Sequence, residues 1–121
     1  MNYFKFLPII FLMFLLSGCN GVTDAEVSIN SNLKIVKTNP QTYSVNYLDG
    51  EFLIEPVIEE VNWDQFHLIA KRKIREDKFE YWIIQLENVQ IYGPLSETEY
   101  LNMIKDLNID LELKPVKKFF W

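Results

Sequence analysis

The feature that most constrains this chain is the apolar run at its N-terminus. A lone Lys5 precedes an almost uninterrupted apolar run from Phe6 to Leu16. A membrane-spanning helix needs roughly 20 apolar residues to cross about 30 Å of hydrocarbon, and this run ends well short of that. A positive start followed by a short apolar run is typical of an export signal that is removed after use. We therefore expect residues 1–18 to be cleaved and residues 19–121 to remain.

The run ends in Leu16-Ser17-Gly18-Cys19, which resembles the lipobox of bacterial lipoproteins. The resemblance implies cleavage between Gly18 and Cys19 and attachment of diacylglycerol to the cysteine sulfur. Two or more acyl chains give stable membrane attachment, at about 0.8 kcal/mol per buried methylene. We expect a cell-envelope protein anchored by lipid on Cys19 and facing outside the cytoplasm, periplasmic or on the cell surface. The competing interpretation is an ordinary thiol beside an ordinary signal peptide.

Charge and cysteine content limit the disulfides that the chain can form and the partners that it can bind. Cys19 is the only cysteine, so the mature chain has no internal disulfide. The net charge is −5, and loss of Lys5 makes it −6. Such an acidic domain is a poor partner for phosphate backbones, which disfavours nucleic acid. Lipid, rather than charge alone, must then hold the membrane contact.

The remaining length fits one small domain, which buries roughly 60 to 70 per cent of its unfolded surface. Residues 19–32 are polar and predict a flexible tether with a reach of roughly 20 Å. From Leu33 onward, to residue 121, alternating apolar and polar residues indicate strands. Asp49-Gly50 predicts a tight hairpin turn between strands at 43–48 and 51–54.

A second meander is expected from strands at 65–71, 79–86 and 89–92. The charged residues 72–78 between the first two predict a solvated hairpin tip. Apolar side chains of the middle strand alternate to both faces, with Tyr81-Trp82-Ile83-Ile84 as its centre. Such a strand should lie inside the sheet, with one face on the core and the other partly covered by a helix or second layer.

One helix is expected at about 96–107. Ser96 and Glu99 have the spacing of a capping box, and Asn108 can adopt the left-handed conformation that ends a helix. Residues 109–113 alternate again and predict a last strand, which Pro115 ends or confines to a sheet edge. The expected fold class is α+β: a single small domain, mainly antiparallel sheet, with one α-helix in its C-terminal half.

This order of elements is similar to a known family. The strand Tyr81–Ile84, the segment Tyr92-Gly93-Pro94-Leu95-Ser96, the helix containing Tyr100, and Leu107-Asn108-Ile109 resemble small bacterial lipoproteins grouped as domain of unknown function 3997. The resemblance covers roughly the C-terminal half of the mature chain. It implies a fold relationship and no known activity, so no functional residues are carried over.

Few residues suited to catalysis or metal binding are present. His67 is the sole histidine, the glycines are not spaced as in phosphate-binding loops, and no cofactor or metal is expected. The densest titratable group is Glu59, Glu60, Asp64 and His67, where a carboxylate beside an imidazole could act as a general base. The simpler interpretation is a solvated strand face, because Glu59 and Glu60 point to opposite sides.

Aromatic residues are the stronger signal. Trp82 fits a core position, whereas Phe119, Phe120 and Trp121 end the chain and either pack back on the sheet or form an exposed interaction patch. We therefore expect a non-enzymatic module that binds another envelope protein or acts as an accessory. The alternative is a small-ligand binder or enzyme with a site near Glu60, Asp64 and His67, and a His67→Ala variant would discriminate the two.

Overall fold

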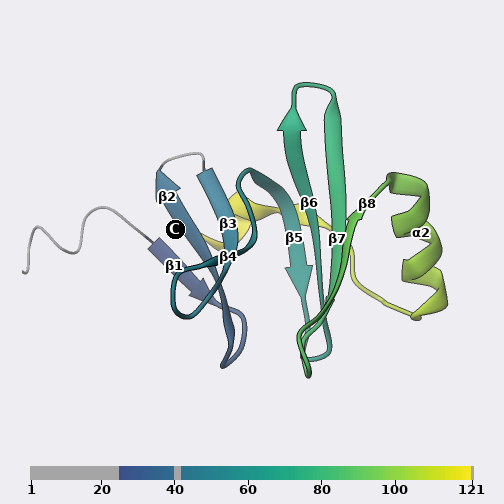
Figure 1. The fold of residues 1–121 in the computed structure, drawn as a ribbon, viewed down its shortest axis with the longest axis horizontal. Coiled ribbons are helices and arrows are strands. Elements are labelled where there is room, and N and C mark those ends of the chain that lie inside the picture. The colour runs from purple at the N-terminus through teal and green to yellow at the C-terminus, as the bar shows by residue number, and fades with distance from the viewer. Residues whose placement is uncertain (1–24, 40–41, 121) are drawn as a thin grey trace, which may run out of the picture.

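The computed structural model describes residues 25–39 and 42–120. In this part of the chain two antiparallel sheets and one α-helix form three layers (Figure 1). The first sheet has the order β1-β2-β3-β4, from β1 (Ala25–Ser28), β2 (Leu33–Asn39), β3 (Thr42–Tyr47) and β4 (Phe52–Ile54). The second has the order β8-β7-β6-β5-β9, from β5 (Ile58–Trp63), β6 (His67–Arg75), β7 (Lys78–Gln85), β8 (Gln90–Leu95) and β9 (Lys114–Pro115). The helix α2 (Glu97–Asp106) follows β8, and a 3-10 turn, η2 (Val116–Phe119), follows β9. The α+β class expected from the sequence is confirmed.

Two apolar cores separate these layers. The larger core lies between the sheets and includes Ile35 and Val45 of the first sheet with Leu68 and Ile84 of the second, all fully buried or nearly so. The smaller core lies under α2 and includes Ile69 of β6, Ile83 of β7 and Tyr100 of the helix. Since adjacent residues of a strand point to opposite faces, β6 and β7 supply both cores. The prediction of an interior β7 strand with two covered faces is confirmed.

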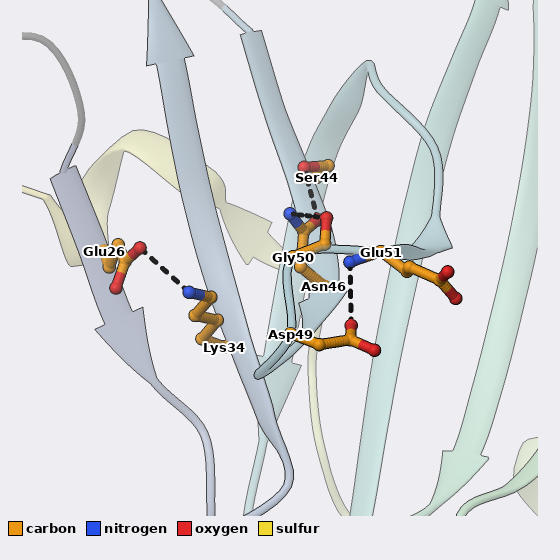
Figure 2. A network of polar contacts seen from close by, with 7 residues as sticks. All are labelled: Glu26, Lys34, Ser44, Asn46, Asp49, Gly50 and Glu51. Carbon is orange, nitrogen blue, oxygen red and sulfur yellow. Dashed lines mark hydrogen bonds and ion pairs between the residues drawn. The ribbon is translucent and has the colours of Figure 1, made fainter.

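The predicted Asp49-Gly50 hairpin is also confirmed. The Tyr47 amide donates to the Glu51 carbonyl at 2.9 Å, and Gly50 has a φ of 100°, which glycine adopts without steric cost. Figure 2 shows that the Asp49 carboxylate accepts from the Glu51 amide at 2.9 Å. The Asp49 side chain therefore stabilises the turn that the Asp49-Gly50 sequence predicts.

Buried polar groups on β3 are satisfied locally. The Ser44 hydroxyl donates to Oδ1 of Asn46 at 2.7 Å, and Asn46 Nδ2 donates to the Gly50 carbonyl at 3.3 Å (Figure 2). Both side chains are buried, where an unpaired polar group would cost about 1 to 3 kcal/mol. These bonds tie β3 to the turn that follows it.

The ordered sheet begins earlier than the expected boundary at Leu33. Within the expected tether, Ala25–Ser28 forms β1, which pairs antiparallel with β2 and is mostly exposed. Lys34 Nζ and the Glu26 carboxylate lie 3.0 Å apart across the pair (Figure 2). A short polar strand has little apolar periodicity of its own. It can therefore be recognised only from its pairing with the neighbouring strand.

The charged segment 72–78 is mostly strand rather than a long tip. β6 continues to Arg75 and β7 starts at Lys78, which leaves a turn of only Glu76 and Asp77. Arg72 lies opposite Glu80, and their side chains form an ion pair at 3.0 Å. Opposite charges across a pair favour the ladder, so these residues extend the hairpin.

The predicted helix is confirmed at both ends. The Ser96 hydroxyl accepts from the Glu99 amide, and the Glu99 carboxylate accepts from the Ser96 amide, as a capping box requires. These bonds hold the pKa of the Glu99 carboxyl below its usual value. At the other end Asn108 has a φ of 55°, and the Ile109 amide donates to the Ile104 carbonyl at 3.0 Å. This is the Schellman arrangement that closes a helix.

The expected strand at 109–113 is wrong. This segment forms no ladder, and only Lys114–Pro115 pairs, with Val61 and Glu60 of β5. Ile109, Leu111 and Leu113 pack instead on the core under α2. The alternation of apolar and polar residues therefore comes from an extended segment that covers this core without pairing in a sheet. Pro115 does lie on an edge strand, as its missing amide donor requires.

Candidate functional site

The residues suggested by the sequence for a catalytic or ligand site do not form one cluster. Glu60 lies opposite Lys71 in the sheet, with 4.0 Å between its carboxylate and Lys71 Nζ. His67 is four residues before Lys71 on β6, a separation of about 13 Å along a strand. The structure therefore separates Glu60 from His67.

Asp64 has a structural task in the turn between β5 and β6. Its Oδ1 accepts from the amides of Phe66 and His67, both at 2.8 Å. The Asp64 amide donates to the His67 carbonyl at 3.0 Å, and the Leu86 amide donates to the Phe66 carbonyl at 2.9 Å. These bonds hold the turn and fix it to the end of β7.

Phe66 is the prominent side chain at this end of the molecule. It is 58% exposed although aromatic, and it lines two neighbouring grooves. One groove, of about 440 Å³, is lined by Phe66, His67, Gln85, Glu87 and Asn88. The other, of about 400 Å³, is lined by Asn30, Ser31, Asn32, Gln65, Phe66, Leu86 and Glu87. We call these residues the turn surface, because the β1–β2, β5–β6 and β7–β8 turns meet there (Figure 1).

The turn surface has a polar rim, with Glu87 as its one acidic side chain, around an aromatic centre. Asn32, Gln65, Gln85 and Asn88 supply amide groups that both donate and accept hydrogen bonds. In the sequence, Phe66 is marked only as a neighbour of His67 on an expected strand. An aspartate before a strand is a local signal for the Asp64 turn. The meeting of three turns that are distant in the chain has no such local signal.

Glu60 belongs to a second group of polar residues under α2. The Tyr81 hydroxyl donates to the Glu97 carboxylate at 3.1 Å, and the rings of Tyr81 and Tyr100 stack at 4.8 Å. Burial raises the pKa of the Tyr100 hydroxyl to about 12, with smaller effects from Tyr81 and Glu60. Burial, and then the bond to Glu97, also raise the pKa of the Tyr81 hydroxyl. Both phenols are therefore neutral at physiological pH, and this group holds the helix on the sheet.

Trp82 has a structural role in the core. It packs against the core between the sheets, and its Nε1 is buried with no hydrogen-bond partner among the described residues. A Cβ added to Gly93 would lie 2.4 Å from Cε3 of the indole. Gly93 is therefore required for β8 to pass over this ring, which explains one residue of the Tyr92–Ser96 segment noted in the sequence.

The C-terminal aromatics pack back onto the domain. Phe120 is 7% exposed and lies 5.0 Å from the Tyr43 ring, centroid to centroid. Phe119 is half-buried, with its ring 4.8 Å from that of Trp63. Trp121, like Gly18 and Cys19, lies outside the described residues. Of the two arrangements that the sequence left open, Phe119 and Phe120 have the packed one.

Two further properties bear on the type of site. Across residues 25–39 and 42–120, no three His, Cys, Asp or Glu side chains are grouped as a metal site would need. No helix in these ranges is both long and apolar enough to cross a membrane.

Comparison with known proteins gives one finding. The family model described as "Protein of unknown function (DUF3997)" matches residues 26–117. Neither the curated proteins nor the solved structures contain a match. The resemblance noted for residues 81–109 is confirmed and extends over both sheets, from β1 to η2. This chain therefore belongs to the DUF3997 family.

Proposed function

We propose that this protein is a lipid-anchored bacterial envelope protein that binds another envelope protein, without catalysis, through the turn surface. The observation that carries the proposal is the position of Phe66. It is 58% exposed, lies on a turn held by four hydrogen bonds, and lines two grooves. Aromatic residues, phenylalanine among them, are enriched at protein interfaces.

Energetic reasoning supports a protein partner. A phenylalanine ring provides a large contact area with only two side-chain torsions to restrict, so little entropy is lost on binding. The fixed turn reduces that cost further, because the backbone is already ordered. The surrounding amides can pair with backbone groups of a partner and exclude water from the ring. The turn surface thus has an apolar centre and a polar rim, as protein interfaces have.

The anchor in this proposal is lipid on Cys19, with Gly18 at the cleavage position. Its support is the sequence Leu16-Ser17-Gly18-Cys19 after a short apolar run. β1 begins at Ala25, six residues after Cys19, so the proposed anchor keeps the domain close to its membrane. A partner in the same envelope compartment would then meet the domain at high local concentration.

The test is crosslinking in cells followed by purification of the tagged protein from detergent-solubilised membranes. Phe66→Ala should remove the crosslinked partner, because it deletes the central ring. Leu101→Ala is the matched control, since Leu101 is 57% exposed and lies on α2. Cys19→Ala should lose both the membrane fraction and the partner.

Two results would contradict the proposal. If Phe66→Ala and Leu101→Ala recover the same partner equally well, the turn surface is not the interface. If the N-terminal peptide of the purified protein carries no lipid on Cys19, lipid on that residue is not the anchor.

The groove of His67 favours a second candidate, binding of a small polar ligand. His67 there adjoins Gln85, Glu87 and Asn88 in about 440 Å³. His67→Ala should then abolish ligand-induced stabilisation, which a protein interface centred on Phe66 would not require. Glu60 has no part in this candidate, because the structure places it elsewhere.

A further inference from the structure

A larger groove lies at the end of the sandwich opposite the turn surface. It has a volume of about 690 Å³ and is open to solvent. Four parts of the chain line it: Thr42–Tyr43, Val57–Glu59, Lys73–Glu76 and Pro115–Lys117. These are the start of β3, the start of β5, the tip of the β6–β7 hairpin and the β9–η2 segment. We call this region the basic end.

The lining of the basic end has a small excess of positive charge, with Asp77 beside it in the β6–β7 turn. Lys73, Arg75 and Lys117 line the groove against Glu59 and Glu76, whereas the whole chain carries −5. Lys37 adds a further cation, with its Nζ 6.0 Å from the centroid of Tyr43 in the groove wall. Lys73 Nζ is 3.3 Å from the Glu76 carboxylate. Among the described residues, the other three cations form no ion pair.

Exposed apolar side chains accompany these cations. Ile74 is 40% exposed and Val57 is 36% exposed, and both line the same groove. Basic side chains beside exposed aliphatic groups suit the boundary of a membrane, where anionic headgroups meet hydrocarbon.

Strand register places the proposed anchor near this end. Ala25 lies opposite Lys37, which lies opposite Tyr43 in the groove wall. Two strand spacings, about 10 Å, therefore separate Ala25 from the basic end. The six-residue link from Cys19 to Ala25 reaches at most about 20 Å. β1 then runs away from this end (Figure 1), and Asn30 of the turn surface lies in the turn that follows it.

We infer that the basic end faces the membrane and contacts its anionic lipid headgroups, while the turn surface points away toward the envelope space. The inference rests on the proposed lipid anchor at Cys19. The anchor supplies the affinity, and the contact sets the orientation of the domain. A domain held in this way presents Phe66 to partners instead of to the bilayer.

The test uses the lipidated full protein in vesicles of phosphatidylcholine, with or without phosphatidylglycerol. Because an acylated Cys19 no longer reacts, a variant with one new cysteine carries a polarity-sensitive dye at one site only. Ile74→Cys labels the basic end, and Phe66→Cys labels the turn surface. The dye at position 74 should shift to shorter wavelength and be quenched by lipid-borne quenchers when phosphatidylglycerol is present. The dye at position 66 should report water in both vesicles.

Charge variants test the headgroup contact. In the Ile74→Cys background, Lys73→Glu with Lys117→Glu should abolish the phosphatidylglycerol dependence. Lys105→Glu, which reverses the charge of one lysine on α2, should leave it intact. Quenching at position 66, or at neither position, would overturn the orientation. Flotation and the mass of the N-terminal peptide report the lipid separately, and an unlipidated product would overturn the anchor and the orientation together.

Discussion

At the scale of single residues, the titratable groups that suggested chemistry have structural roles. Asp64 accepts two amide hydrogens in a turn, and Glu60 lies near Lys71. Their residue types could be read from the sequence, but their partners could not, because a carboxylate serves a turn, an ion pair or a catalytic site equally well. Only the three-dimensional neighbours decide among these roles.

Tyr100 gives a test at this scale. Its pKa is raised from 10.0 to about 12 in the folded protein, chiefly by burial. The folded state therefore keeps the proton that the unfolded state loses, and the stabilisation is complete below pH 10. It should be lost progressively as the pH rises from 10 toward 12. Denaturant unfolding at several pH values in this range measures the effect.

Tyr100→Phe is the control, because it removes the titration and keeps the ring. The loss of stability between pH 10 and 12 should be smaller in this variant. Lysine titration affects both proteins alike, so the difference between them isolates Tyr100. Parallel stability curves for the two proteins would show that burial does not shift this group.

At the scale of elements, the helix and the hairpins were predictable because their signals are local. A capping box, a left-handed Asn108 and the Asp49-Gly50 turn each form within a few residues of sequence. β1 and the segment 109–113 were not predictable, because their state depends on what lies beside them. A mostly polar segment became a strand, and an alternating one became a cover for the core.

The helix cap gives a test at this scale. Ser96→Ala removes the hydroxyl that accepts from the Glu99 amide and should lower the free energy of unfolding by about 1 kcal/mol. Ser96→Asp keeps an acceptor at the cap and should retain most of the stability. Urea unfolding of the three proteins measures both changes. Equal losses in the two variants would mean that the cap bond does not stabilise α2.

At the scale of the whole molecule, the C-terminal segment joins the two sheets. η2 follows β9 of the second sheet, and the next residue, Phe120, packs on Tyr43 of the first. Arg72 makes a second link between sheets: its Nε donates to the carbonyls of Glu55 and Pro56, in the segment that connects β4 to β5. Both links hold the sheets together at the walls of the larger core.

Two phenylalanines give a matched test at this scale. Phe120→Ala empties a buried site and should lower the free energy of unfolding by about 3 to 5 kcal/mol. Phe66→Ala makes the same chemical change at an exposed site and should alter it by no more than about 0.5 kcal/mol. Thermal and urea unfolding measure the pair. A stable Phe120→Ala protein would show that the C-terminal segment does not close the core.

The sequence by itself determined the α+β class, the helix with its caps, and the Asp49-Gly50 turn. Each depends on a pattern of neighbouring residues, so chain-local physics suffices. Only the tertiary structure revealed the short strand β1, the separation of Glu60 from His67, the packing of Phe120 on Tyr43, and the two opposed ends of the sandwich. These features join residues that are distant in the chain, and burial against a partner surface contributes more to such contacts than any local preference does.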